Sequence, residues 1–201
     1  NETPYGLTLS NNRQNENTAT GTTIGTFTGL DVDAGDTFTY SLIDPGGNSD
    51  ESKFTLGSTT GILKNAIVFN YEAKNSYTIT VRVTDAAGAY YEDDFTISVL
   101  DVNETPTDIS LSNSSIDENT PTGSTVGTFS TTDPDSGNTF TYSLVNGLGD
   151  TNNGSFYFDG AVLKSAEVFN YEVKSSYSIR VRSTDQGGLF REEIVTINIT
   201  N

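Results

Sequence analysis

The sequence predicts an all-β protein: two tandem immunoglobulin-like β-sandwiches with Greek-key connectivity and about seven strands each. Three observations predict this architecture, namely an internal repeat, apolar residues that alternate with polar ones, and short turns rich in Gly, Asn and Asp. The chain has 201 residues, enough for two units of about 100 residues each. Because it contains no Cys and no Trp, the signature of a true immunoglobulin domain is absent, and only the architecture is supported.

The internal repeat consists of ordered matches along the whole chain. The matching segments are Asn-Glu-Thr-Pro at 1–4 and 103–106, Phe-Thr-Tyr-Ser-Leu at 38–42 and 140–144, and Phe-Asn-Tyr-Glu at 69–72 and 169–172. Because the matches keep their order, we predict two copies of one domain, residues 1–102 and 103–201. Two residues are missing from the second copy, somewhere between Leu144 and Leu163.

The strands of the first copy follow from the period of its apolar residues. The clearest strand is 76–84, where Tyr77, Ile79, Val81 and Val83 alternate with polar residues and therefore share one face. The segment 85–88 contains Gly and suits a hairpin turn into a last strand. The other expected strands lie at 6–10, 22–28, 37–43, 54–56 and 62–64, and the last strand contains Phe95, Ile97 and Val99. No helix is predicted.

The charge of the chain excludes several classes of function. There are 27 acidic and 10 basic residues, which gives a formal net charge of −17. Such a chain repels nucleic acid and anionic lipid, so neither nucleic-acid binding nor membrane insertion is expected. The absence of Cys and His removes thiol and Ser-His catalysis and the usual ligands of zinc, copper and haem. Only a hard cation with oxygen ligands fits.

The acidic residues concentrate at expected strand ends and at the joint between the copies. In the order of the chain they are Glu16, Asp31, Asp33, Glu72, Asp85, Asp101, Glu104, Glu118, Asp133, Asp135, Glu172 and Asp185. Taken singly, each is a turn residue or a solubilising charge. Clustered carboxylates are costly without a counter-ion, and Ca²⁺ takes about six to eight oxygen ligands in a flexible geometry. Calcium is therefore the candidate ion.

Five of these segments resemble, in the right order, the calcium-binding motifs of cadherin repeats. They are Glu16-Asn17, Asp31-Val32-Asp33, Asn70-Tyr71-Glu72, Asp85 and the linker 101–106, and the second copy repeats the first four. The resemblance is closest to the cadherin-like tandem repeats of large bacterial surface and secreted proteins, whose linker often reads Val-Asn-Glu-x-Pro as here. It implies an extracellular, cell-surface or secreted location.

The resemblance also implies the calcium ligands. At the joint they would be Glu16, Asn70, Glu72, Asp101, the Val102 carbonyl, Asn103, Glu104, the Thr105 carbonyl, Asp133, Asp135 and Asp185, with a carbonyl from 136–138. Asn70 and Glu104 depart from the family pattern, and both belong to its outermost ion. A further half-site would comprise Asn1, the Thr3 carbonyl, Asp31, Asp33 and Asp85, and could hold a lone ion. The opposite half-site, with Glu118, Glu172 and Asn201, is expected to be weak or empty.

Two functions follow from this set. The first is a calcium-rigidified segment of a cell-adhesion protein, which acts as an extender or as an adhesive segment with neighbouring repeats as its partners. The alternative is recognition of carbohydrate or of another copy through the aromatic residues Tyr90, Tyr91, Tyr157 and Phe190, which core or cross-strand packing would equally explain. An enzyme is not expected, because catalytic residues rarely repeat in both copies of a duplicated domain.

Overall fold

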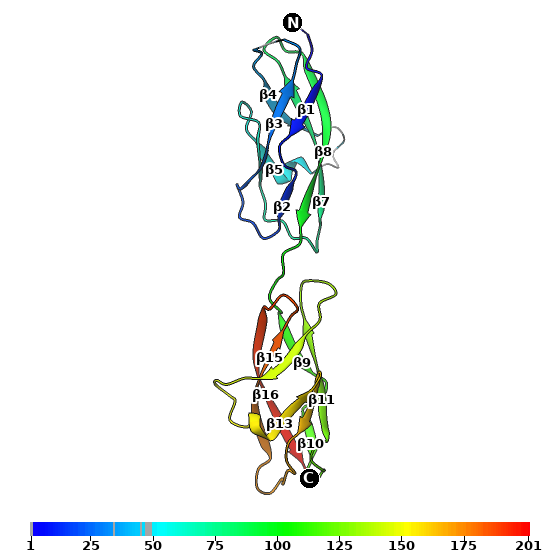
Figure 1. Ribbon diagram of the computed structural model, residues 1–201, viewed down its shortest axis with the longest axis vertical. Helices are drawn as coiled ribbons and strands as arrows, with labels where there is room; N and C mark the ends of the chain where they lie inside the picture. Colours follow the sequence, from blue (N-terminus) through cyan, green and yellow to red (C-terminus); the bar gives the residue numbers. More distant parts are fainter. Residues whose placement is uncertain (1, 34, 45, 47–49) are drawn as a thin grey trace. The chain divides into compact units, whose positions relative to one another are not determined.

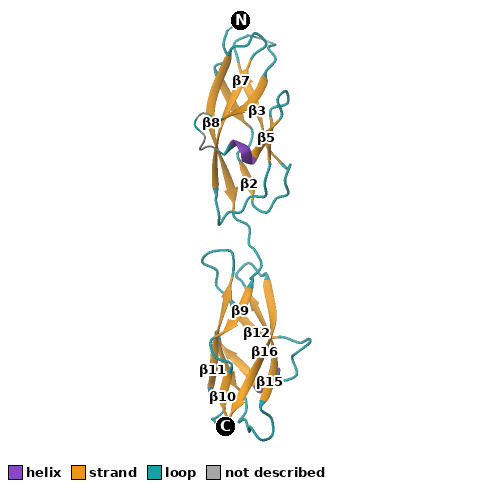
Figure 2. Ribbon diagram, turned by 180° about the vertical axis from the view of Figure 1, so that it is seen from behind, coloured by secondary structure: helices purple, strands orange, loops and turns teal. Residues whose placement is uncertain are grey.

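Figure 1 shows the computed structural model of the chain, in which residues 2–33, 35–44, 46 and 50–201 are described. The chain forms two compact units, Asn1–Val102 and Asn103–Asn201, and each unit has its own pair of four-stranded sheets. The described residues contain helix only as two single 3₁₀ turns, η1 (Glu51–Lys53) and η2 (Asn153–Ser155), as the colours of Figure 2 show. The all-β prediction is confirmed.

The described strands of unit 1 form two sheets. The first has the order β1-β3-β6-β5, with β1 (Gly6–Leu9), β3 (Thr23–Leu30), β6 (Ile62–Asn65) and β5 (Phe54–Leu56) all antiparallel to their neighbours. The second has the order β2-β8-β7-β4, with β2 (Arg13–Asn15), β8 (Tyr90–Leu100), β7 (Ser76–Thr84) and β4 (Thr39–Ile43). In this sheet β2 runs parallel to β8, whereas the other pairs are antiparallel.

Unit 2 repeats this topology strand for strand. Its first sheet has the order β13-β14-β11-β9, with β13 (Phe156–Asp159), β14 (Val162–Ser165), β11 (Thr125–Thr132) and β9 (Asp108–Leu111). Its second has the order β10-β16-β15-β12, with β10 (Ser115–Asp117), β16 (Phe190–Thr200), β15 (Ser176–Thr184) and β12 (Thr141–Leu144). As in unit 1, the short strand β10 is parallel to its partner β16.

Each unit therefore has eight strands among its described residues, one more than the sequence predicts. The strands that prediction missed are β2 and β10, which have three residues each and a single buried side chain, Gln14 or Ile116. Three residues are too short to display a period of two. The missing pair of residues is located as well, because β13 and β14 are joined by Gly160 and Ala161 alone, whereas residues 57–61 join β5 and β6.

Each unit buries a core of its own between its two sheets, and that core positions the acidic ends. In unit 1, Phe69 is 1% exposed and lies 4.7 Å from Tyr77 between ring centroids. In unit 2, Phe169 is equally buried and lies 4.8 Å from Tyr177. Because each phenylalanine directly precedes an Asn-Tyr-Glu segment, its burial anchors that segment at the end of the sandwich.

Candidate metal centres

Four aspartates gather where unit 1 begins, and we call them the leading cluster: Asp31, Asp33, Asp36 and Asp85. Asp31 directly follows β3, Asp85 directly follows β7, and Asp36 precedes β4. Carboxylate oxygens of Asp31, Asp36 and Asp85 lie within 4.8 Å of one another. Two strands from different sheets end at the same end of the sandwich, which is why residues far apart in the sequence meet there.

Backbone N–H groups hold the carboxylates of the leading cluster in place. Asp33 Oδ2 accepts a hydrogen bond from the Glu2 N–H at 2.7 Å, and Asp31 Oδ1 accepts one from the Asp33 N–H at 3.0 Å. Asp85 Oδ1 accepts the N–H groups of Ala87 and Ala89, at 2.8 and 2.9 Å. These bonds engage one oxygen of each carboxylate, and they fix the direction in which the other oxygen points.

Two oxygens of the leading cluster are buried without a hydrogen bond in the described part of the chain, Asp31 Oδ2 and Asp36 Oδ2. Burial raises the pKa of Asp36, and the negative charges of Asp31, Asp33 and Asp85 raise it further. The pKa of Asp33 is lowered, chiefly by the backbone hydrogen bond from Glu2. Buried, mutually repelling carboxylate oxygens are stabilised by a bound cation, so the residues present fit Ca²⁺.

Unit 2 builds the same arrangement with Asp133, Asp135 and Asp185. Asp135 Oδ2 accepts the Glu104 N–H at 2.7 Å, and Asp133 Oδ1 accepts the Asp135 N–H at 3.0 Å. Asp185 Oδ1 accepts the Leu189 N–H at 2.9 Å. Here too Asp133 Oδ2 and Asp135 Oδ1 are buried with no hydrogen-bond partner among the described residues. The second unit therefore repeats both the fixed oxygens and the oxygens directed elsewhere.

Asn103 joins this set from the linker. Its Nδ2 donates to Asp185 Oδ2 at 3.0 Å. A Cβ at Gly187 would lie 2.4 Å from Asn103 Cγ and Oδ1, so the absence of a side chain at Gly187 makes room for the amide. Asn1, the matching residue of the first copy, lies outside the described residues.

A second acidic set lies where unit 1 ends, and we call it the trailing cluster: Glu16, Glu72 and Asp101. Their carboxylate oxygens lie within 4.8 Å of one another. Glu16 is 2% exposed; its Oε2 accepts the Tyr71 N–H at 2.8 Å, and its Oε1 accepts the Val102 N–H at 2.9 Å. Glu16 thus links the segment after β2, the segment after Phe69 and the start of the linker.

The matching residues of unit 2 repeat part of the trailing cluster. Glu118 Oε2 accepts the Tyr171 N–H at 2.9 Å, as Glu16 does from Tyr71. Glu172 Oε1 lies 3.5 Å from Asn201 Nδ2. The expected opposite half-site is therefore assembled within unit 2.

Asn70 has a local role that sequence reasoning missed. Its Oδ1 accepts the Ala73 N–H at 2.6 Å and caps the turn that follows, and Asn170 Oδ1 does the same for the Val173 N–H at 3.0 Å. An amide oxygen has two acceptor positions, so this bond leaves Asn70 one more. The carbonyls of Thr3 and Thr105 belong to the segments that lead into β1 and β9.

Asp36 is the site residue that the sequence analysis did not select. It follows the Asp-x-Asp segment after Gly35, and the counterpart of Asp36 in unit 2 is Asn138, an amide. The signal that could have found it is the third acid at this one position of the first copy. Asn138 Nδ2 lies 3.5 Å from Asp135 Oδ2, where Asp36 instead adds a charge to its own cluster.

The aromatic residues considered for carbohydrate binding differ in exposure. Tyr90 and Phe190 are exposed, but the guanidinium groups of Arg82 and Arg182 lie over their rings, 4.2 and 4.0 Å from the centroids. Tyr91 packs against the core of unit 1, so its expected exposure is wrong. Tyr157 is exposed.

A model of the cadherin domain matches the chain twice, at residues 11–100 and 112–200. The chain belongs to the cadherin family. Human Protocadherin Fat 4 is 31% identical over 177 residues, which are 85% of this chain and 3% of that relative. Human Protocadherin-16 is 30% identical over 171 residues, 81% of this chain and 5% of that relative. The chain thus spans a small fraction of the length of these cadherin relatives.

Solved cadherin structures have the same fold. Human Protocadherin-24 EC1-2 matches with a TM-score of 0.74 at 21% identity and covers 94% of this chain and 93% of that one. Mouse Cadherin-23 EC22-24 matches with a TM-score of 0.72 at 25% identity, over 98% of this chain and 65% of that one. The family resemblance is confirmed, but none of these relatives is bacterial, so they lend no support to that part of the expectation. Among the described residues, no helix is long and apolar enough to cross a membrane.

Proposed function

We propose that this chain is a calcium-binding tandem cadherin module of an extracellular or cell-surface protein, and that it serves cell adhesion as an extender or adhesive segment. The observation that carries the proposal is the repeated arrangement of backbone-fixed aspartates. Asp31 Oδ2 in the first copy and Asp133 Oδ2 in the second are buried with no hydrogen bond in the described part of the chain. Duplication of such oxygens at the same place is expected of an ion site rather than of a solubilising surface.

The proposed ligands fall into three sets. The leading set comprises Asp31, Asp33, Asp36 and Asp85, with Asn1 and the Thr3 carbonyl. The second set comprises Asp133, Asp135, Asp185, Asn103 and Glu104. The third comprises the trailing cluster, Asn70 and the carbonyls of Val102 and Thr105. Cadherin domains bind Ca²⁺ as a family, and the donor types here are the oxygens that Ca²⁺ prefers.

Calcium binding gives the module a mechanical role. Without the ion, the acids before and after the linker repel one another, and the linker residues 101–107 contain no strand. A bound ion that shares ligands from a repeat and from the linker restricts the linker. Extracellular modules bind Ca²⁺ with dissociation constants of about 10⁻⁴ to 10⁻³ M, which extracellular fluid saturates and cytosol does not.

Thermal unfolding with calcium and with chelator tests the calcium part. We expect millimolar Ca²⁺ to raise the melting temperature, because a ligand at about 100 times its dissociation constant adds about 2.7 kcal/mol. The matched variants Asp85→Asn and Asp185→Asn each reduce the calcium-dependent shift. The control Asp159→Asn, an exposed acid that pairs with Lys164, leaves the shift unchanged. Equal melting temperatures with and without calcium would exclude the proposal.

Small-angle scattering tests the mechanical part. A calcium-dependent narrowing of the distribution of distances is expected in the wild type and not in Asp101→Ala, since Asp101 stands between the trailing cluster and the linker. Unchanged scattering despite bound calcium would leave a calcium-binding module with no stiffening role.

Carbohydrate recognition has less support than adhesion through protein contacts. The two exposed rings Tyr90 and Phe190 each have one face covered by a guanidinium group, which removes the platform on which a sugar would stack. Cadherin domains are adhesion modules, and we propose no catalytic role for the repeated acids.

A further inference from the structure

The two units differ in charge on one equivalent surface, the outward side of the hairpins β7–β8 and β15–β16. In unit 1, Thr80 lies opposite Asp94 and Arg82 opposite Glu92. In unit 2, the same positions hold Arg180 opposite Ile194 and Arg182 opposite Glu192. We call the first surface the acidic face and the second the arginine face.

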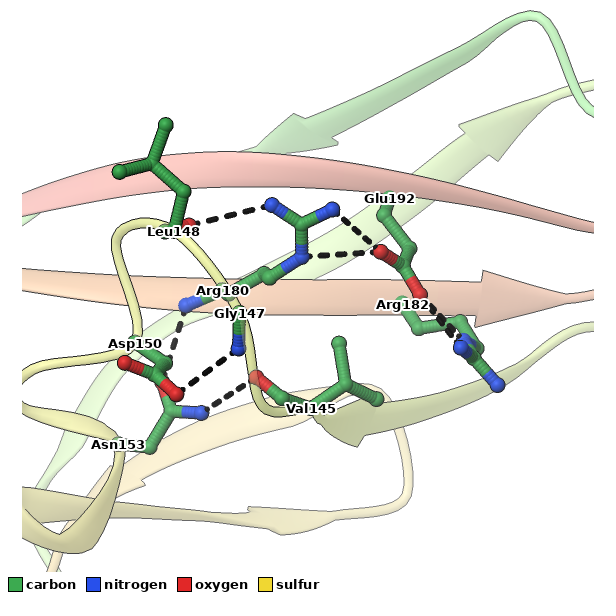
Figure 3. A network of polar contacts seen from close by, with 8 residues as sticks. All are labelled: Val145, Gly147, Leu148, Asp150, Asn153, Arg180, Arg182 and Glu192. Atoms are coloured by element: carbon green, nitrogen blue, oxygen red, sulfur yellow. Dashed lines mark hydrogen bonds and ion pairs between the residues drawn. The ribbon is translucent and has the colours of Figure 1, made fainter.

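On the arginine face two guanidinium groups share one carboxylate (Figure 3). Arg180 donates through Nε and Nη2 to Glu192 Oε2 at 2.9 and 2.6 Å, and Arg182 Nε donates to Glu192 Oε1 at 2.8 Å. Hydrogen bonds from Arg182, and next from Arg180, lower the pKa of Glu192, so this carboxylate is ionised at neutral pH. One positive charge therefore remains on this face.

A loop holds Arg180 from above, as Figure 3 also shows. Arg180 Nη1 donates to the Leu148 carbonyl at 3.1 Å, and a Cβ at Gly149 would lie 2.7 Å from Ile194. Gly149 has a φ of 89°, which glycine adopts readily and which lets the loop lie directly on Ile194. The guanidinium of Arg180 is thus positioned before any partner arrives, which lowers the entropic cost of binding.

The arginine face also exposes apolar side chains. Leu148 is 82% exposed, Ile194 48% and Phe190 47%, and the Arg182 guanidinium lies over the Phe190 ring. Arginine beside aromatic and aliphatic side chains is the composition that protein interfaces favour at their centres.

The acidic face offers the opposite charge. Thr80 Oγ1 donates to Asp94 Oδ1 at 2.6 Å, and Arg82 pairs with Glu92. Neither Asp93 nor Asp94 has an ion pair in the described part of the chain. A shallow hollow of about 310 Å³ is lined by Thr80, Glu92, Asp93 and Asp94. Two negative charges remain here, one on each aspartate.

We propose that two copies of this chain associate by placing the acidic face of unit 1 in one copy against the arginine face of unit 2 in the other. This pairing rests on the adhesive role proposed above and names the partner as a second copy. Each copy carries one face of each kind, so two copies can make the contact once or twice. The net charge of −17 opposes association, but at about 0.15 M salt charges more than about 8 Å apart are screened and those in contact are not.

Sedimentation equilibrium of the 201-residue chain in calcium and about 0.15 M salt tests the pairing. We expect Asp94→Arg, and separately Arg180→Thr, to raise the dissociation constant at least about tenfold, because each leaves a like or neutral charge opposite the partner. Thr is the residue of unit 1 at the position of Arg180, which favours folding. An equimolar mixture of the two variants should associate again, since each variant supplies one intact face. Lys164→Glu, a reversal on the other sheet, should leave the constant unchanged.

A wild type that stays monomeric at about 1 mM, or variants that associate as tightly as the wild type, would overturn the pairing. Calcium binding is measured on the same samples. Binding without association would leave the calcium module standing and remove this pairing, whereas variant-sensitive association without calcium binding would do the reverse.

Discussion

The two repeats share their topology and their acidic ends but differ on one sheet face and at two places in the interior. The leading aspartates accept the same backbone hydrogen bonds in both copies, as Asp33 and Asp135 show. The outward positions held by Thr80 and Arg180 have instead diverged in charge. The comparison indicates that the ends serve a purpose common to both repeats, whereas each outer face is free to serve a contact of its own.

The first interior difference is a compensated pair. In unit 1, Gly29 lies beside Val83, and a Cβ at Gly29 would lie 2.9 Å from Val83 Cγ2. In unit 2, the equivalent residues are Thr131 and Ser183, whose hydroxyl oxygens are 2.6 Å apart. One copy fills the space with a large apolar side chain, and the other fills it with two small hydrogen-bonded ones.

The second interior difference is a buried amide. Gln14 is 7% exposed, and neither its Oε1 nor its Nε2 has a hydrogen-bond partner among the described residues. The equivalent residue of β10 is Ile116, which is 6% exposed. A buried amide without partners destabilises its unit, so unit 1 has an uncompensated cost here.

The largest effect is expected when unit 2 receives the amide of unit 1. Ile116→Gln should destabilise unit 2 by about 3 kcal/mol, because it removes a buried aliphatic side chain and buries an unpaired amide. Scanning calorimetry of the full chain should show one of two transitions shifted down. An unchanged profile would mean that β10 carries no stability and that the comparison with β2 is empty.

The compensated pair can be broken and restored. Gly29→Thr alone should destabilise unit 1 by about 2 kcal/mol through overpacking against Val83. Adding Val83→Ser should recover part of that loss, because the pair then matches unit 2. Denaturant unfolding of the single and double variants gives the coupling. If the two effects simply add, the residues are not compensating each other.

Removing the buried amide should stabilise unit 1. Gln14→Ile is expected to add about 1 to 2 kcal/mol, since it replaces an unpaired amide by the side chain that unit 2 uses. Calorimetry should show the other transition, not the one moved by Ile116→Gln, shifted up. As a control, Gln14→Glu keeps the size and adds a charge, and it should shift that transition down. A gain from both variants would contradict the buried-amide explanation.

The smallest effect concerns acid stability. The pKa of Glu192 lies below its ordinary value of 4.5 because Arg182, and then Arg180, donate hydrogen bonds to it. A lowered folded-state pKa adds stability above the unfolded pKa, and this stability is lost as the pH falls through the folded one. Glu192→Gln should therefore make the stability of unit 2 less dependent on pH below 4.5. Identical pH profiles of the two proteins would show that the pairing has no energetic consequence.

The regular part of the fold could be predicted because it is written in the period of single segments. The alternation at Tyr77, Ile79 and Val81 identifies β7, and an aspartate directly after such a strand must lie at an end of the sandwich. The short strands β2 and β10 could not be found, because each buries one side chain only. Asp36 and the shared carboxylate of Glu192 were missed for another reason: their neighbours come from loop paths and strand register, which no local pattern contains.

Calcium titration by calorimetry on the intact chain tests the central claim most directly. The account predicts binding with dissociation constants of about 10⁻⁴ to 10⁻³ M, and fewer bound ions after Asp31→Asn or Asp133→Asn, the two residues with buried oxygens that lack hydrogen bonds in the described part of the chain. No binding at about 10 mM calcium, roughly ten times the weakest expected constant, would contradict it.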